Sequence, residues 1–481
     1  MAPSLTDYVI IGAVAAVATF VVTPIVGAVA RARGWMVEPN ERSVHTSPMP
    51  EVGGVAMLFG FFVALLVALS LGRFDILFED NSEPIGIALA ALVVFATGFF
   101  DDIFDMAPPG KVTGVVLAGL VLWWFGATMF YFRVPFFDVI ILSSDWTPLV
   151  TVLWVLGMTQ AINFIDGLDG LAAGIVAIGA TAFFLYANKL DDLGLLAEQN
   201  LGPLIAIITA GISLGFLPHN FNPARIFMGD SGAFLLGLLL AVSTSVVGGR
   251  ADPNAQGFVG QTFFFFAPLA IPLLILGVPI LDTLFAIVRR ASKRQALDVA
   301  DKGHLHHRLM NLGHGHRRSV LILWTWTALL SGFVLYPVLT GENPSYLSFG
   351  VGALGIVLYT VLHPSVRRKR AIAVEAALNR PASEQLDPSR PERREADEAH
   401  DEAHDDDGDD DGDEAENGIA GDADGAGDRA DPGDDGAGDP DDAVVEQAGG
   451  APPADGTARR RPADDVLPAS SAAVSSRSRK P

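Results

Sequence analysis

A series of apolar runs, each about 17–25 residues long, fills the first 370 residues of the chain. A run of this length crosses a bilayer as an α-helix. We predict eleven spans, at approximately residues 7–30, 52–72, 85–100, 112–132, 147–164, 171–188, 201–217, 231–248, 262–288, 319–340 and 346–366. The sequence therefore predicts an all-α polytopic membrane protein with about eleven transmembrane helices.

The composition changes after about residue 370. Residues 371–481 hold 31 Asp and Glu against 11 Lys and Arg, so most of the net charge of −23 falls there. A segment rich in Asp, Ala, Gly and Pro cannot bury enough apolar surface to fold. We expect a membrane domain at residues 1–370 and a disordered acidic tail at 371–481 with no catalytic role.

Overall charge and cysteine content exclude several classes of function. An acidic chain is not a nucleic-acid binder by its global charge. The chain has no cysteine, which excludes disulfides, zinc–thiolate sites and thiol catalysis. The first span, Tyr8 to Ala30, has no basic segment before it and is too long for a signal peptide, so we expect it to be retained.

The basic residues of the loops predict the orientation. With the N-terminus outside, the inner loops hold 17 Lys and Arg and the outer loops hold four. This asymmetry is typical of a cytoplasmic face. The loops with clustered acids, histidines, asparagines and glycines all fall on this inner side. We therefore expect a plasma-membrane protein whose active site faces the cytoplasm and takes a soluble cytosolic substrate.

The stretch NFIDGLDGLAAG places two carboxylates and an amide between two spans. Asn163, Asp166 and Asp169 are spaced three apart and share one face if the run is helical. Hard oxygen ligands on one face suit Mg²⁺ and phosphate chemistry. The alternative is a polar turn between two helices, broken by Gly167 and Gly170.

A second acidic block, FFDDIFDMAPPGK, follows the third span. Asp101 and Asp102 come directly after an apolar run, where carboxylates are costly and are usually retained for a task. The alternative is a helix-end cluster in the headgroup region. Lys111 begins the next span and either meets an anionic phosphate or extends its ammonium to the membrane surface.

The block FLPHNFNPARIFMGDSGAFLLG follows the seventh span. It gathers Asn220, Asn222, Arg225 and Asp230 at the opening of the eighth span. A Gly-Asp-Ser-Gly turn at a helix N-terminus holds a metal through its carboxylate while backbone N–H groups meet phosphate. The turn is equally compatible with an ordinary helix cap.

The largest inner loop contains a basic block, DKGHLHHRLMNLGHGHRR. Without a cysteine or a spaced acid, this block favours an anion site over a zinc site. The alternative is a basic patch against anionic lipid. Its basic groups are His304, His306, His307, Arg308, His314, His316, Arg317 and Arg318.

Together and in this order, the four blocks resemble the polyprenyl-phosphate N-acetylhexosamine-1-phosphate transferases, which start lipid-linked cell-envelope glycans. The resemblance covers roughly residues 30–320. A contiguous three-histidine motif marks the muramoyl-pentapeptide branch, whereas this chain has His304-Leu305-His306-His307-Arg308. The block is similar to the N-acetylglucosamine-1-phosphate branch, in particular to the actinobacterial members that begin the arabinogalactan linker.

The resemblance implies a reaction in which UDP-N-acetylglucosamine and a polyprenyl phosphate give polyprenyl-diphospho-N-acetylglucosamine and UMP. It also implies Mg²⁺ as the cofactor, with Mn²⁺ as the alternative, and a homodimer. Both direct attack by the prenyl phosphate and a covalent aspartyl intermediate remain open, and we favour direct attack.

The resemblance also implies residue roles. The metal ligands would be Asn163 and Asp230. The catalytic carboxylates would be Asp101, as base or orienting group, with Asp102 beside it, and Asp166 and Asp169 completing the pocket. The substrate-binding groups would be Lys111, Asn222, Arg225, His304, His306, His307 and Arg308.

Three other hypotheses remain. Within the enzyme class, the donor could be the UDP-muramoyl pentapeptide. A secondary transporter predicts charges near the bilayer midplane and an inverted repeat, whereas the acids of this chain fall at the cytoplasmic ends of the spans. A membrane anchor whose acidic tail binds basic partners predicts that deletion of residues after about 371 abolishes function.

Overall fold

The computed structural model describes residues 3–38, 48–79, 81–129, 131–133, 139–194, 196, 200–248, 309–310, 312, 314–340 and 346–362. These residues fall within one compact unit, residues 1–387, and they are mostly helical. The long helices are α1 (Leu5–Arg33), α2 (Gly54–Ser70), α4 (Glu83–Phe104), α5 (Pro108–Trp124), α6 (Thr147–Ile165), α7 (Leu171–Asp192), α8 (Gly202–Asn220), α9 (Gly229–Gly248), α13 (His316–Thr340) and α14 (Tyr346–Leu362).

The remaining elements are short. A one-turn helix, α3, spans Asp75–Phe78. Two antiparallel strand pairs close loops at the ends of helices. Their strands are β1 (Met36–Val37) with β2 (Met49–Pro50), and β3 (Tyr131–Arg133) with β4 (Val139–Ile141).

The helices confirm a multi-pass membrane protein. Seven helices in the described part of the chain are long and apolar enough to cross a bilayer: α1, α4, α6, α7, α8, α9 and α13. The helix α2 and the core of α14 are apolar but shorter. The predicted span at 262–288 lies outside the described residues. Each other predicted span coincides with a helix, and the total of eleven spans remains a prediction.

Local sequence sets the helix ends. At the start of α1, the Ser4 hydroxyl oxygen accepts a hydrogen bond from the Asp7 N–H, and the Asp7 carboxylate accepts one from the Ser4 N–H, which forms a capping box. The helix α5 stops at Trp124, before the predicted end at residue 132, because Gly126 adopts a left-handed conformation with φ of 87°.

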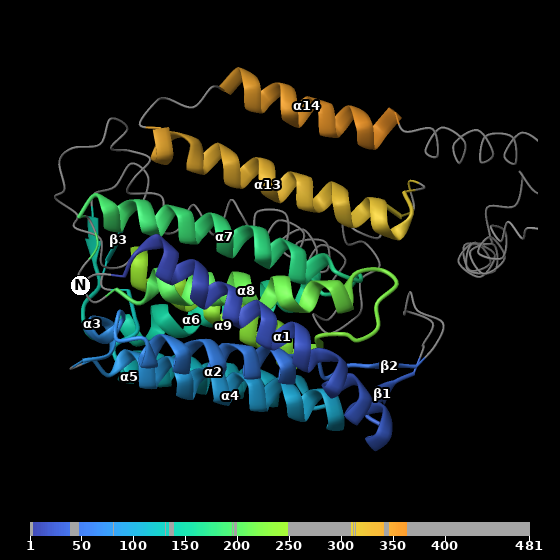
Figure 1. Ribbon diagram of the computed structural model, residues 1–481, viewed down its shortest axis with the longest axis horizontal. Helices are drawn as coiled ribbons and strands as arrows, with labels where there is room; N and C mark the ends of the chain where they lie inside the picture. The colour runs from blue at the N-terminus through green and yellow to red at the C-terminus, as the bar shows by residue number, and fades with distance from the viewer. Residues whose placement is uncertain are drawn as a thin grey trace, which may run out of the picture. The chain divides into compact units, whose positions relative to one another are not determined.

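The helix α9 is the centre of the bundle. It packs against α2, α4, α6, α7 and α8 (Figure 1). In its apolar 18-residue stretch, 94% of the residues are buried inside the protein. Glycines permit the close approach of the neighbours. A Cβ at Gly98 of α4 would collide with the backbone of Asp230 and Ser231, and one at Gly237 would collide with Thr159 of α6. The start of α9 is therefore fixed tightly against α4.

Two helices extend the bundle on the side of α7. Figure 1 shows α13 beside α7 and α14 beside α13, on the side away from α4 and α5. The Trp324 indole of α13 covers Gly174 of α7, and its Nε1 donates a 3.4 Å hydrogen bond to the Leu171 carbonyl.

Candidate active site

The site forms where the end of α4 meets the start of α9. The Asp102 carboxylate accepts hydrogen bonds from the backbone N–H groups of Asp230, at 2.7 Å, and Ser231, at 3.2 Å. A negative charge at a helix N-terminus is stabilised by the helix dipole and by the free N–H groups. Gly229 has φ of 69°, and a Cβ there would collide with the Asp102 carboxylate and the Glu51 carbonyl. Only glycine fits this turn.

A lysine from α5 joins two carboxylates of this site. The Lys111 Nζ lies 2.6 Å from Asp101 Oδ2 and 3.1 Å from Asp230 Oδ2. The turn between α4 and α5 brings it there through Asp105, whose φ is 50°, while the Met106 N–H donates to Asp101 Oδ1 at 2.9 Å. One ammonium thus holds carboxylates that lie 129 residues apart in the chain.

Asn163 completes the contacts of Asp230. From the last turn of α6, its Nδ2 donates a 2.6 Å hydrogen bond to Asp230 Oδ1. Both Asp230 carboxylate oxygens are therefore engaged, one by Asn163 and one by Lys111. Asn163 lies beside Asp230, as expected for a shared site, with its amide nitrogen facing the carboxylate.

The cluster of Asp101, Asp102 and Asp230 fits a divalent cation. One carboxylate oxygen from each residue lies within 4.8 Å of the other two. Hard oxygen donors suit Mg²⁺, which is commonly held by one or two carboxylates together with substrate phosphates. Three carboxylates with one lysine also leave excess negative charge for a cation to neutralise.

A fourth acid, Glu51, faces the same cluster, and the sequence analysis did not predict it. The segment before α2 pairs with the segment before α9: the Gly53 and Gly54 N–H groups donate to the Phe227 and Met228 carbonyls, both at 2.9 Å. Burial, and then the charges of the Asp230 and Asp101 carboxylates, raise the pKa of Glu51 to about 7, against the opposing effect of Lys111. An acid two residues before the Gly53–Gly54 pair that opens a span was the available signal.

The two other predicted acids lie in a turn, because α6 ends at Ile165 and Gly170 adopts φ of 77° before α7 begins. The run is therefore not helical at Asp166 and Asp169, and their catalytic role stays a prediction. Burial is the largest cause that raises the pKa of Asp166 well above its usual range, followed by the charges of Glu51, Asp230 and Asp169. The charges of the acidic cluster therefore act on Asp166.

Asp169 organises the loop after α8. Its Oδ2 accepts hydrogen bonds from Asn222 Nδ2 and from the Ala224 N–H, both at 3.0 Å. Arg317, at the start of α13, donates from Nε to the Asn222 carbonyl at 3.0 Å and to Asn222 Oδ1 at 3.2 Å. The loop is therefore held between a carboxylate on one side and a guanidinium on the other.

Of the remaining predicted substrate-binding residues, the structure describes Arg225 but not the histidine block. Arg225 lines a cavity of about 580 Å³ together with Asn222 and Trp324. The histidine block, His304, His306, His307 and Arg308, lies outside the described residues. The structure thus brings together Asp101, Asp102, Lys111, Asn163 and Asp230 in one cluster, with Asp166 electrostatically coupled to it and Asp169 and Asn222 in the adjoining loop.

Part of the chain matches a known protein family. Residues 84–248 match the model of glycosyl transferase family 4. The matched segment begins in α4 and ends with α9, so it contains the acidic cluster.

Three curated proteins show the range of similarity. The decaprenyl-phosphate N-acetylglucosaminephosphotransferase of Mycobacterium leprae is 36% identical, over 68% of this chain and 83% of its own length. A probable undecaprenyl-phosphate N-acetylglucosaminyl 1-phosphate transferase of Bacillus subtilis is 33% identical, over 65% and 79%. A phospho-N-acetylmuramoyl-pentapeptide-transferase of Staphylococcus aureus is more distant, at 28% over 59% and 83%.

Proposed function

Given that the chain belongs to glycosyl transferase family 4, we propose that it is a membrane enzyme that transfers N-acetylglucosamine 1-phosphate from UDP-N-acetylglucosamine to a polyprenyl phosphate and releases UMP. The similarity to proteins named for this chemistry supports the donor and the acceptor over the muramoyl-pentapeptide alternative. The observation that supports the assignment of the site is the Asp101–Lys111–Asp230 contact, which joins two carboxylates and an ammonium from three helices, α4, α5 and α9.

The reaction joins two anions, so most of its barrier is electrostatic. Positioning of the phosphates and stabilisation of their charge should supply most of the rate. Bound Mg²⁺, or Mn²⁺ in its place, would neutralise diphosphate charge and stabilise the leaving UMP. Asp230, Asp101 and Asp102 are the residues that would hold the metal, because their oxygens converge.

The remaining groups have separate tasks in this proposal. Lys111 reaches the same carboxylates and would turn its ammonium to a substrate phosphate when a metal replaces it there. Asp101, within 2.6 Å of Lys111, would orient the attacking phosphate oxygen of the acceptor. Asn163 would fix the Asp230 carboxylate, as its 2.6 Å hydrogen bond supports.

The loop after α8 would bind the nucleotide sugar. Asn222 and Arg225 line one cavity, and Asp169 and Arg317 fix the loop from two sides. His304, His306, His307 and Arg308 would neutralise phosphate charge, as the resemblance implies. A phosphate oxygen of the acceptor is already a nucleophile, which favours direct attack over a covalent aspartyl intermediate.

The test is turnover by the full-length chain in detergent, with polyprenyl phosphate and Mg²⁺ and with either UDP-N-acetylglucosamine or UDP-muramoyl pentapeptide as donor. UMP release with the first donor alone is the expected result, and chelation of the metal should stop it. The variants Asp230→Asn and Asp101→Asn should lose turnover while they still fold, whereas Asp75→Asn, an exposed acid outside the site, should retain it. If the folded protein released no UMP with either donor, the proposal would be refuted.

A further inference from the structure

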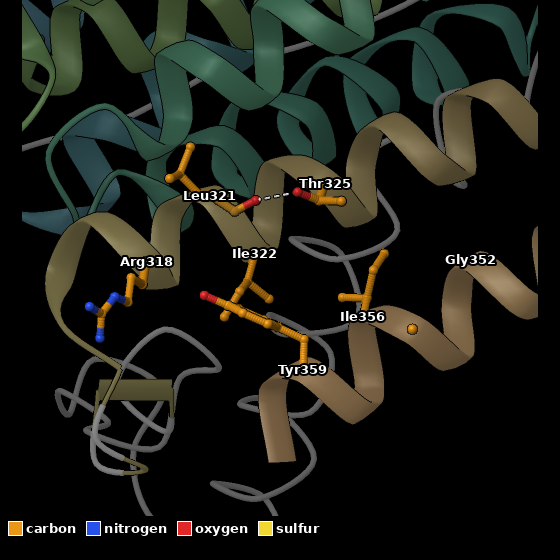
Figure 2. A pocket seen from close by; sticks show the side chains of 8 residues that line it. Arg318, Leu321, Ile322, Thr325, Gly352, Ile356 and Tyr359 are labelled. Carbon is orange, nitrogen blue, oxygen red and sulfur yellow. Dashed lines mark hydrogen bonds between the residues drawn. The ribbon is translucent and has the colours of Figure 1, made fainter. Parts of the chain in front are cut away.

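A groove lies between α13 and α14, outside the acidic cluster. It has a volume of about 420 Å³, within the range of roughly 300–1,000 Å³ that is typical of small-ligand sites. Figure 2 shows its lining from both helices. The lining residues are Arg318, Leu321, Ile322, Thr325, Gly352, Gly355, Ile356 and Tyr359.

Most of the groove wall is apolar. Figure 2 shows Ile322 of α13 pointing toward α14, which carries Ile356, and Leu321 also lines the groove. The Thr325 hydroxyl adds little polarity, because it donates a 2.7 Å hydrogen bond to the Leu321 carbonyl within its own helix. An apolar wall along two membrane helices suits a hydrocarbon chain.

One end of the groove is cationic and polar. Figure 2 shows the Arg318 side chain at the end where the Tyr359 ring also lies. In the described part of the chain no carboxylate forms an ion pair with Arg318, which is exposed. An accessible guanidinium at the mouth of an apolar groove is complementary to a phosphate attached to a hydrocarbon chain.

This polar end lies near the loop after α8 that adjoins the candidate active site. The neighbouring Arg317 donates hydrogen bonds to Asn222 in the loop beside Asp169. The end of α14 is fixed there by His314, whose Nε2 lies 2.8 Å from the Thr360 carbonyl and whose ring stacks on Tyr359. A charged headgroup at Arg318 would therefore sit at a membrane surface, with its chain running into the bilayer.

Two glycines create the space. Gly352 and Gly355 line the groove where larger side chains would fill it. A Cβ at Gly355 would meet no atom within 4 Å, so the position can accept a side chain without a backbone clash. Gly350 on the same helix is equally open but does not line the groove, which supplies a matched control.

We propose that the α13–α14 groove binds one anionic phospholipid, with its phosphate at Arg318 and an acyl chain along Leu321, Ile322 and Ile356. Basic pockets between membrane helices are known to recognise anionic headgroups. The occupant is a bilayer phospholipid rather than the acceptor lipid, because the acceptor phosphate must reach Lys111 and Asp101, and α13 and α14 lie on the side of the bundle away from α4 and α5 (Figure 1).

The first test counts bound lipids on the full-length protein. The purified chain is titrated in detergent with phosphatidylglycerol or with phosphatidylcholine, and bound lipid is measured by native mass spectrometry. One phosphatidylglycerol should bind in preference to phosphatidylcholine. Gly355→Leu should weaken that binding at least tenfold, and Gly350→Leu should leave it unchanged. Equal binding by Gly355→Leu and the unaltered chain, both folded, would overturn the proposal.

The second test examines the charge and the source of the lipid. Arg318→Gln should lose the preference for phosphatidylglycerol, whereas Arg31→Gln, at the end of α1, should keep it. An Arg318→Gln variant that kept its preference would contradict the headgroup assignment. Displacement of phosphatidylglycerol by one equivalent of polyprenyl phosphate would assign the groove to the acceptor instead. Conversion of a dimer to a monomer by Gly355→Leu would assign it to a contact between copies.

Discussion

The carboxylate of Asp102, at the end of α4, accepts a 2.7 Å hydrogen bond from the backbone N–H of Asp230, at the start of α9. A residue of the acidic cluster therefore also caps the central helix. The two aspartates differ in what their loss should do, because the Asp102 side chain supports a helix while the Asp230 side chain contacts only other polar groups of the site.

We predict that Asp102→Ala lowers both turnover and stability, whereas Asp230→Ala abolishes turnover with no comparable loss of stability. The loss of a helix cap costs about 0.5–2 kcal/mol. Removal of the Asp230 side chain takes a negative charge out of a crowded acidic cluster. Thermal unfolding of both variants in detergent without divalent metal measures the difference. An equal fall in midpoint for the two variants would contradict the capping role of Asp102.

Lys111 competes with a metal for the same carboxylates. Its Nζ lies 2.6 Å from Asp101 and 3.1 Å from Asp230, so a cation bound there must displace the ammonium from at least one of them. We predict that Lys111→Met binds Mn²⁺ more tightly, because the carboxylates lose their positive neighbour, but turns over at least tenfold more slowly. Paramagnetic resonance of free Mn²⁺ measures binding, and UMP release measures turnover. Weaker Mn²⁺ binding by this variant would show that the lysine supports the metal.

Glu51 should make stability depend on pH. Its pKa is raised to about 7 in the folded protein, from an ordinary value of 4.5. The unfolded chain therefore releases this proton at lower pH than the folded chain, and the stability contribution is lost as pH rises from about 4.5 through 7.

We predict that Glu51→Gln escapes this loss. Without divalent metal, its unfolding midpoint relative to the unaltered chain should rise between pH 4.5 and 7 and level off above that range. Glu38→Gln, an exposed residue outside the site, is the control and should show no such trend. A constant difference across the whole range for Glu51→Gln would mean that neither burial nor the charges of Asp230 and Asp101 raise the pKa of Glu51.

Arg317 should act on substrate binding through Asn222. Its two hydrogen bonds fix the Asn222 backbone and side chain, so Arg317→Gln should release the loop that lines the cavity with Arg225. We predict about a tenfold rise in KM for UDP-N-acetylglucosamine, the equivalent of one charged hydrogen bond of about 1.5 kcal/mol, with a smaller change in kcat. Arg317→Lys should recover only part of the loss, because lysine cannot reproduce the planar guanidinium geometry. A fall in kcat alone would place Arg317 in the chemical step.

The orientation in the membrane can be tested directly because the chain has no cysteine. Ala107, between α4 and α5, lies at the end of the bundle that holds the site, and Leu193 follows α7 at the other end. In intact cells, a membrane-impermeant thiol reagent should label Leu193→Cys and should label Ala107→Cys only after permeabilisation. The reverse pattern would place the site on the outer face.

The helices could be predicted from the sequence because each is a long apolar run, and an apolar run long enough to cross the bilayer is enough to indicate a helix. Their ends depend on single residues. Gly126 stops α5 early, and Gly170 with the end of α6 at Ile165 places Asp166 and Asp169 in a turn. A residue with positive φ ends a helix even where the apolar pattern continues, so the pattern alone does not give the helix end.

The site was predictable as a set of residue types but not as a set of contacts. Asp101 and Asp102 were marked by carboxylates at the end of an apolar run, and Asp230 by a Gly-Asp-Ser-Gly turn at the start of one. Their convergence depends on pairings across more than a hundred residues, which no local pattern reports. Glu51 was missed for the same reason, since its neighbours in space are distant in the chain.

The burial of α9 has a consequence for the order in which the protein is made. In the described part of the chain, the helices that pack around it are α2, α4, α6, α7 and α8, and these precede it in the sequence. A growing chain inserts from its N-terminus, so these neighbours are already in the bilayer when α9 leaves the ribosome. The helix that bears Asp230 can therefore pack against these neighbours as soon as it enters the bilayer.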